Sequence, residues 1–552
     1  MATSESNGKR ISLNKVQTST SMESNGNEST ISDKLGFDDV IVRYLGQFGR
    51  YQRYIFFLVC IPSIITSMDS LSWTFSGAKS NHRCKGITET NNADYWNPSP
   101  ISLYRRQNCS LSKHPVLKEC PFEECVLGES KTCPNGHIYD ASANSYTAIQ
   151  RWDIVCDKSV LRASIQSMYY LGQMFGSIIF GFLGDRIGRK KVFFIALIVQ
   201  FVSGMGMALS PHWSIYALSR FGVGIAHPGI FVIAVVIGVE LIGPKYRQLS
   251  SILASIFWSS GQIVLGILAY NVRDYRFLHA CIAFPALIFV SYWWLIPESA
   301  RWLVAHKKYK EADEVMRKAS KINGTYLPDN WYEHLVNEDL LNNRKKTHHN
   351  FLDLIRTPVI RKRAFASFFC WPVCSMLYYG ISMNTNFLGG DLYLTFIFGG
   401  LSEFPALVLT GLLVDKVGRK PVLIGGFITA AFAMLSSVVF DGEVYPAIGI
   451  TQSLLAKSAL ACTYSCLYIF TPELFPTVIR NTAMGGCSTI ARIGAITASY
   501  VSMWLVDSFG KMIMVLPFAA LAILASITIL FCLPETTGKE LHESIEDVEK
   551  DE

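Results

Sequence analysis

The chain has 552 residues, of which half are hydrophobic and only 17% are charged, and its mean hydropathy is +0.27. This composition excludes an ordinary soluble protein and favours the membrane class. The formal net charge of +7 is concentrated between apolar segments, which argues against a phosphate-binding face and therefore against nucleic acid as a partner.

The first fifty residues are polar. Residues 1 to about 34 are rich in Ser, Asn and Thr and predict a disordered tail, whereas residues 37–49 predict an ordered approach to the first span. No charged start is followed by an apolar stretch and a small-residue cleavage site, so no cleaved signal peptide is expected.

Long apolar runs follow. About 20 helical residues suffice to cross a hydrocarbon core of roughly 30 Å. Twelve such runs predict twelve spans: 53–76, 161–183, 191–210, 213–238, 249–270, 276–296, 364–386, 391–414, 420–440, 446–470, 482–505 and 511–533. Because the count is even, both termini are expected on one side of the membrane.

Basic residues predict which side that is. They follow span two, where Arg186, Arg189 and Lys190 lie, and span eight, where Arg419 and Lys420 lie. The connection between spans six and seven carries fourteen Lys and Arg. Lys and Arg are enriched in cytoplasmic loops. We therefore expect a multi-pass protein of the plasma membrane with both termini in the cytoplasm.

The connection between spans one and two, residues 77–160, should then face outward. It holds six of the fourteen cysteines: Cys84, Cys109, Cys120, Cys125, Cys133 and Cys156. Six cysteines in an oxidising compartment predict three disulfides, and fifteen pairings remain open. Asn108 begins a glycosylation sequon in the same loop, whereas the sequons at Asn27 and Asn323 fall on the cytoplasmic side and should not be used.

The other eight cysteines lie in or beside spans. Cys370 with Cys374, and Cys462 with Cys466, have helical i,i+4 spacing but no His or carboxylate close in sequence. We interpret them as small packing residues and expect no metal site.

Two halves of the chain repeat. The segment 181–190, GFLGDRIGRK, recurs at 411–420 as GLLVDKVGRK. Glu240 with Arg247 recurs as Glu473 with Arg480, and the segment 297–299, PES, recurs at 534–536 as PET. Three sequence motifs that recur in the same order in both halves predict a duplicated six-helix unit.

The expected organisation follows from the repeat. It comprises a cytoplasmic tail (1–50), a first six-helix half with the cysteine-rich loop (51–296), a cytoplasmic central loop (297–363), a second half (364–533) and a cytoplasmic C-terminal tail (534–552).

The duplicated motifs also predict a gate. Gly181 and Gly184 permit close helix approach, and Asp185 can meet a helix N-terminus or a basic partner across the interface between the halves. The candidate gating residues are Gly181, Asp185, Arg186, Gly188, Arg189, Glu240, Arg247, Asp415, Arg419, Glu473 and Arg480. The alternative is a solvated basic loop that only obeys the charge rule.

These motifs resemble the major facilitator superfamily over residues 37–541. Within it, the segment 297–303, PESARWL, resembles both the sugar porters and the organic ion carriers. The cysteine-rich loop, the segment 37–39 (FDD) and the segment 472–477 (PELFPT) resemble the organic cation, anion and zwitterion transporters of the solute carriers. That resemblance implies two pseudo-symmetric halves of six helices that alternate access to a central cavity.

Charged residues inside spans are costly and mark candidate binding sites. At about 1.5 Å per residue, Glu403, Lys457 and Arg492 all reach the middle of the membrane. Asp69 and Arg220 lie nearer the outer ends of their spans, where an interfacial role competes. The alternative for the central trio is a buried ion pair between Glu403 and one base, which leaves one positive charge for a substrate carboxylate.

The resemblance sharpens the substrate class. Cation carriers of the family have an acidic residue where this chain has Arg492, and anion carriers have a basic residue where it has Leu407. Glu403 together with Arg492 and Lys457 most resembles the carnitine-type branch, whose substrates bear a quaternary amine and a carboxylate. Tyr378 resembles the family's substrate-lining tyrosine, and an ammonium over such a ring gains about 0.5–2 kcal/mol.

The sequence leaves other functions open. An organic-anion carrier is the main alternative; a sugar-type transporter and a transporter-like receptor are further ones. An enzyme is not expected, because His227 and His279 are the histidines of the spans and lie on separate helices. No nucleotide-binding glycine loop occurs and no cofactor is expected, whereas coupling to sodium or protons remains open.

Overall fold

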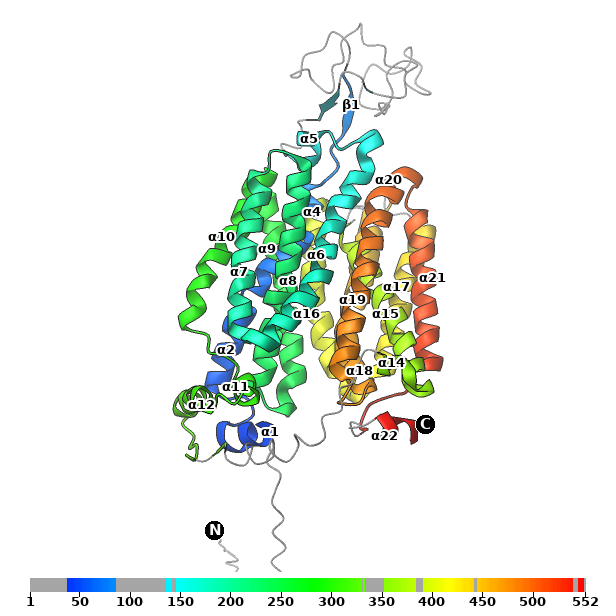
Figure 1. Ribbon diagram of the computed structural model, residues 1–552. Coiled ribbons are helices and arrows are strands. Elements are labelled where there is room, and N and C mark those ends of the chain that lie inside the picture. The colour runs from blue at the N-terminus through cyan, green and yellow to red at the C-terminus, as the bar shows by residue number, and fades with distance from the viewer. Residues whose placement is uncertain are drawn as a thin grey trace, which may run out of the picture.

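The computed structural model describes residues 37–85, 133, 136–140, 145–329, 331–332, 352–383, 391–440, 444–539 and 545–550. The chain forms two helical bundles that stand side by side (Figure 1). The short helices α1 (Phe37–Val40) and α22 (Ile545–Lys550) lie at one end, here called the terminus end. The strands β1 (His82–Cys84) and β2 (His137–Tyr139) lie at the opposite end, here called the loop end.

The N-terminal half contains the first six spans. Its elements are α2 (Arg50–Cys60), α3 (Ser63–Leu71), α4 (Trp73–Ser76), α6 (Ser159–Ile187), α7 (Arg189–Leu209), α8 (Trp213–Leu241), α9 (Arg247–Asn271), α10 (Tyr275–Val290) and the 3₁₀ turn η6 (Ser291–Trp294). The helices α2, α3 and α4 follow one path, which is interrupted where Pro62 cannot donate a backbone hydrogen bond.

The C-terminal half contains the other six. Its elements are α15 (Pro358–Met383), α16 (Leu392–Lys416), α17 (Arg419–Val439), α18 (Pro446–Leu474), α19 (Arg480–Tyr500), the π-helical turn η8 (Val501–Leu505), α20 (Val506–Phe509) and α21 (Met512–Cys532).

Short elements connect or flank these spans. They are the π-helical turn η1 (Ile41–Leu45), α5 (Ala148–Trp152), the 3₁₀ turns η4 (Cys156–Lys158) and η5 (Pro244–Tyr246), α11 (Ala300–Ala305), α12 (Tyr309–Asn323) and α14 (Asp353–Arg356).

Eleven helical segments in the described part of the chain are long and apolar enough to cross a membrane. The remaining predicted span, 161–183, is α6, whose 29 residues extend about 43 Å at 1.5 Å per residue. It packs against α8 and α19, and its buried Gln166 and Gln173 make it more polar than the others. The predicted twelve-helix architecture is therefore confirmed.

Glycines let helices within each half approach closely. A Cβ on Gly224 of α8 would lie 2.1 Å from the carbonyl oxygen of Tyr169 on α6. In the C-terminal half, a Cβ on Gly494 of α19 would lie 2.1 Å from the carbonyl oxygen of Pro372 on α15. A glycine packed against the backbone of a neighbouring helix thus joins α6 to α8 and α15 to α19.

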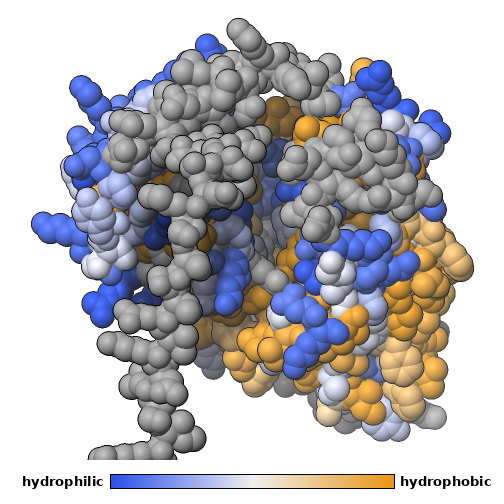
Figure 2. Space-filling view, turned by 90° about the horizontal axis from the view of Figure 1, so that it is seen from below, coloured by the Kyte–Doolittle hydropathy of each residue, from blue (hydrophilic) through white to orange (hydrophobic). Residues whose placement is uncertain are grey.

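The two halves meet along α9 with α16 and along α6 with α19. At the loop end, Arg162 Nη1 of α6 lies 2.8 Å from Asp507 Oδ2 of α20. Nearby, Phe75 of α4 stacks on Tyr393 of α16 with ring centroids 5.3 Å apart. Seen from the terminus end, the molecule is hollowed between the halves (Figure 2).

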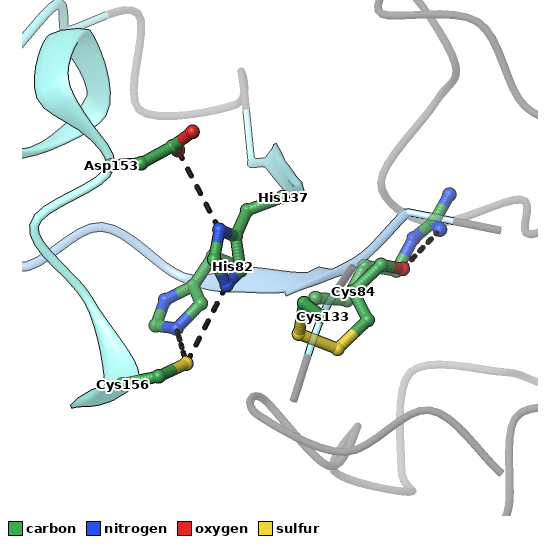
Figure 3. Close-up of a disulfide and its surroundings, with 7 residues drawn as sticks. His82, Cys84, Cys133, His137, Asp153 and Cys156 are labelled. Carbon is green, nitrogen blue, oxygen red and sulfur yellow. Dashed lines mark hydrogen bonds and ion pairs between the residues drawn. A yellow bond between two sulfur atoms is a disulfide. The ribbon is translucent and has the colours of Figure 1, made fainter. Parts of the chain in front are cut away.

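The predicted disulfides are confirmed in part. Cys84 and Cys133 form one, and it ties β1 to the residues before β2 (Figure 3). Cys156 is also disulfide-bonded. Cys109, Cys120 and Cys125, together with the sequon at Asn108, lie outside the described residues.

Cys133, His137 and Cys156 come close enough together to suggest a metal site. Both sulfurs are in disulfides, however, so neither can supply the thiolate that such a site needs. The contacts around His137 are instead structural. The pKa of Asp153 is lowered mainly by its hydrogen bond with His137, against a smaller opposing effect of burial.

Asn323 shows why its sequon is unsuitable for modification. Its Oδ1 accepts from the backbone N–H of Tyr51 at 2.9 Å, and its Nδ2 donates to the carbonyl oxygen of Leu45 and to Gln52 Oε1. The side chain therefore fastens the end of α12 to the start of α2.

Candidate transport site and gates

The centre of the molecule contains a buried ion pair. Glu403 of α16 and Lys457 of α18 have side chains that are each 2% exposed, and Lys457 Nζ lies 3.7 Å from Glu403 Oε1. The structure therefore brings together two of the three charged residues that depth alone placed at the middle of the membrane. It pairs Glu403 with Lys457 and not with Arg492.

Neutral side chains from both halves surround this pair. Gln262 of α9 donates from Nε2 to Tyr378 Oη at 2.7 Å and to Glu403 Oε1 at 3.1 Å. Its Oε1 accepts from Lys457 Nζ at 2.6 Å. Tyr378 donates to Glu403 Oε1 at 3.1 Å, and Ser259 donates to Glu403 Oε2. The carboxylate is thus well supplied with donors, as a buried charge requires.

Arg492 of α19 has a different environment. It is 5% exposed, makes no ion pair with any described residue, and its Nε lacks a hydrogen-bond partner there. Its guanidinium interacts with the phenol groups of Tyr379, Tyr464 and Tyr468. Arg492 is therefore a buried cation near tyrosine rings, and no carboxylate of the described residues neutralises it.

The tyrosines form a continuous aromatic wall. Tyr378 lies 5.3 Å from Tyr379 and 5.9 Å from Tyr464, measured between ring centroids. Tyr379 in turn lies 4.9 Å from Tyr170 of α6. Through these rings the surroundings of Arg492 adjoin those of Glu403, so one region holds a carboxylate, two cations and several ring faces.

Asp69 lies in a separate cluster inside the N-terminal half. It is 2% exposed and accepts a hydrogen bond from Gln200 of α7. Arg220 of α8 is fully buried and donates to the carbonyl oxygen of Asp69 at 2.7 Å and to Gln166 Oε1 at 2.7 Å. The interfacial role proposed for Arg220 is therefore wrong, because its guanidinium is buried inside the bundle, where both Nη atoms are hydrogen-bonded and Nε has no partner among the described residues.

The predicted gating residues cluster at the terminus end. In the N-terminal half, Arg189 lies 2.9 Å from Asp185 and 3.4 Å from Glu240 and donates to the carbonyl oxygen of Gly184. Gly188 has φ 108°, a conformation that favours glycine, and lies against Glu298.

The second half repeats this network. Arg419 lies 3.5 Å from Asp415 and binds both carboxylate oxygens of Glu473 at 3.1 and 3.2 Å. Gly418 has φ 109°. Glu535 accepts from the backbone N–H groups of Arg419 and Lys420 at 3.0 Å each, as Glu298 does from Lys190.

Glu535 caps the N-terminus of α17, and its pKa reflects this position. Burial alone would raise its pKa, but hydrogen bonds from Thr537 and from the backbone of Arg419 and Lys420 outweigh that effect and hold the pKa below its ordinary value. The carboxylate is therefore charged where it meets the N-terminus of α17.

The remaining gating candidates bind in other ways. Arg247 donates to Asp38 of α1 at 2.6 Å, and Arg301 of α11 shares that carboxylate. Arg480 donates to the carbonyl oxygen of Phe475. Arg186 lies over the ring of Phe182, and Gly181 has open space beside it. The close helix approach expected at Gly181 and Gly184 is therefore wrong for Gly181, whereas Gly184 lies close to Ile233 as expected.

In this structure the partners of Asp185 lie in its own half. Asp185 is 80% exposed, and its repeat equivalent Asp415 is 59% exposed. The halves are thus joined by an ion pair at the loop end, while the motif carboxylates at the terminus end are exposed.

Sequence reasoning missed the uncharged members of the site. Gln262, Ser259 and Tyr170 were not singled out, although a glutamine at mid-depth of a span is itself a signal, because burying an amide in hydrocarbon is costly unless it is hydrogen-bonded.

Twelve spanning helices in two matching halves, with a charged and aromatic centre and duplicated gates, define a membrane transporter of the major facilitator fold. A family model described as "Sugar (and other) transporter" matches residues 116–547, and the chain belongs to this family. The organic cation transporter protein of Drosophila melanogaster is 34% identical over 93% of this chain and 95% of its own length. The human organic cation/carnitine transporter 2 is 30% identical over 92% of this chain and 93% of its own.

Solved structures support the fold. The xylose transporter XylE from E. coli in an inward-open conformation aligns with a TM-score of 0.61 at 18% identity, covering 90% of this chain and 99% of that one. The family and these relatives are transporters and not enzymes, and they place this chain among the organic cation transporters and solute carriers of family 22.

Proposed function

We propose that the chain carries small organic cations, and zwitterions that combine a quaternary amine with a carboxylate, across the membrane by alternating access. The names of its relatives, an organic cation transporter and an organic cation/carnitine transporter, support this substrate class. They do not favour the organic-anion alternative.

The observation that carries the proposal is the unneutralised guanidinium of Arg492 among tyrosine rings. A guanidinium presents a planar fork of donors that a carboxylate can accept in pairs. Tyr378 and Tyr379 supply ring faces for an ammonium, and Glu403 supplies negative field beside them. Lys457 offsets that field, so the substrate cation competes with Lys457 for Glu403.

Transport by reconstituted protein tests the proposal. Proteoliposomes are given labelled carnitine, tetraethylammonium or p-aminohippurate, with and without a sodium gradient, a proton gradient and an imposed potential. We expect saturable uptake of carnitine or tetraethylammonium that exceeds uptake of p-aminohippurate. Uptake of p-aminohippurate alone would favour an organic-anion carrier, and the gradients identify any coupled ion.

We further propose that the terminus end faces the cytoplasm and that the chain resides in the plasma membrane. The basic residues at that end, among them Arg186, Lys191 and Lys416, support this orientation. On this topology Asn108 is the glycosylated sequon. A glycosidase mobility shift that disappears in Asn108→Gln is the expected result, and a shift that survives would reverse the topology.

A further inference from the structure

A groove with a volume of about 360 Å³ lies on the outer face of the N-terminal half, near the terminus end. Figure 1 shows α7 and α10, which line it together with η6 and the end of α6, at the outer edge of that half. Apolar side chains line it: Phe194, Ile195, Ile198, Val290, Trp293 and Trp294. It lies apart from the central charges and plays no part in the transport site.

The groove lies where α10 ends and the chain changes to a 3₁₀ turn. The last residue of α10 is Val290, and the chain continues as the 3₁₀ turn η6, which leaves Trp294 79% exposed. The equivalent helix of the C-terminal half, α21, continues as regular α-helix to Cys532, just before Pro534. Pro534 is the repeat counterpart of Pro297, so the two halves differ at this point.

A basic side chain lies at the edge of the groove. Lys191 is exposed, lines the groove, and makes no ion pair or hydrogen bond with any residue that the structure describes. The neighbouring Lys190 holds its ammonium 4.7 Å from the ring of Trp293. In the other half, Lys420 donates to the carbonyl oxygen of Leu530 at 2.7 Å. The position equivalent to Lys191 in the repeat is occupied there by Pro421.

We propose that this groove binds a phospholipid with a negatively charged headgroup: the acyl chain lies against the apolar wall, and the headgroup pairs with Lys191. Ile195 and Ile198 are 40% and 51% exposed on the same face, as expected of a surface in contact with lipid. Tryptophan is enriched at the depth of lipid headgroups. An unpaired ammonium at that depth attracts an anionic lipid more than a zwitterionic one.

The test uses the purified full-length protein in detergent micelles. Phosphatidylserine and phosphatidylcholine with identical acyl chains are added, and native mass spectrometry counts bound lipid while the thermal unfolding midpoint is followed. We expect phosphatidylserine to bind more tightly and to raise the midpoint more. Lys191→Gln should weaken phosphatidylserine binding about fivefold and leave phosphatidylcholine unchanged.

Three further variants make the result specific. Lys191→Arg keeps the charge and should keep the preference. Lys416→Gln removes an exposed lysine of α16 at the same end and should change nothing. Trp294→Ala removes part of the wall and should weaken both lipids. The proposal is overturned if the wild-type protein binds both lipids equally, or if Lys416→Gln loses as much as Lys191→Gln.

Discussion

The three buried charges at the centre of the C-terminal half differ in what neutralises them. Glu403 and Lys457 are neutralised by each other and are further hydrogen-bonded by Gln262. Arg492 has no ion-pair partner among the described residues, and tyrosine phenol groups lie near its guanidinium. A buried charge without a counter-charge is costly, so Arg492 is the residue whose environment a substrate anion would improve most.

Replacing Arg492 should therefore change selectivity. We expect Arg492→Ala to raise the KM for carnitine about 10- to 100-fold, because the substrate carboxylate loses a charge-assisted hydrogen bond. Uptake of tetraethylammonium, which has no carboxylate, should change far less. The two substrates are compared at matched surface expression. Arg492→Lys serves as the control that keeps the charge but lacks the paired donors of the planar guanidinium. An equal loss for both substrates would remove the recognition role.

Glu403 should matter for both substrates and for folding. Glu403→Gln leaves Lys457 buried without a counter-charge, which costs about 3–5 kcal/mol of stability. We expect lower expression, a lower thermal midpoint and reduced uptake of carnitine and tetraethylammonium alike. The double variant Glu403→Gln with Lys457→Met removes both charges and should recover stability but not transport. Recovery of both would assign the pair to folding alone.

The pairing at this site could be predicted only in part. Counting residues along a span gives the depth of a side chain, and depth correctly grouped Glu403 with Lys457. It does not give the direction in which each helix presents that side chain, so Lys457 and Arg492 were equivalent candidates. Helix packing decides between them, and it depends on contacts such as Gly494 with Pro372 that have no periodic signature.

At the scale of elements, the spans were predictable because hydropathy alone specifies a helix of membrane length. The expected span 276–296 corresponds to α10 with η6, Tyr275–Trp294. The interruption between α2 and α3, the 3₁₀ turn η6 and the π-helical turn η8 were not predicted, since local backbone geometry within an apolar run leaves little trace in composition. The duplicated motif, by contrast, predicted a repeated six-helix unit, and equivalent ion pairs form around Arg189 and Arg419. It did not predict that Asp185 would find its partner within its own half.

The gate at the end of α6 can be tested by one substitution. Asp185→Asn removes an exposed carboxylate that pairs with Arg189 and should slow turnover severely, while surface expression and equilibrium substrate binding stay near wild type. Binding is measured by scintillation proximity and turnover by uptake velocity. Asp415→Asn tests the same position of the repeat. A normal uptake velocity in Asp185→Asn would leave the motif as a solvated basic loop.

At the scale of the whole molecule, the structure represents one access state. The ion pair between Arg162 and Asp507 joins the halves at the loop end, and Phe75 packs on Tyr393 beneath it. At the terminus end Asp185 and Asp415 remain exposed. Rocking of the halves would open the loop end and close the terminus end. Removing charges at the two ends should therefore shift the equilibrium between the two access states in opposite directions.

A reporter cysteine at Phe75 makes this bias measurable. Phe75 is 6% exposed and lies between the halves, so Phe75→Cys should react with a membrane-impermeant maleimide only when the loop end opens. Adding Asp507→Asn should speed labelling about 1.4- to 5-fold, the effect of losing a partly exposed ion pair. Adding Asp185→Asn should slow the labelling of Phe75→Cys, because the terminus end then closes less readily.

A charge reversal provides the control. Asp507→Arg should speed labelling further, and its combination with Arg162→Asp should restore the slow rate, because the ion pair then forms again with the charges exchanged. Changes of the same sign from both ends would contradict a rocking mechanism, since one equilibrium cannot be moved toward the same state by weakening opposite gates.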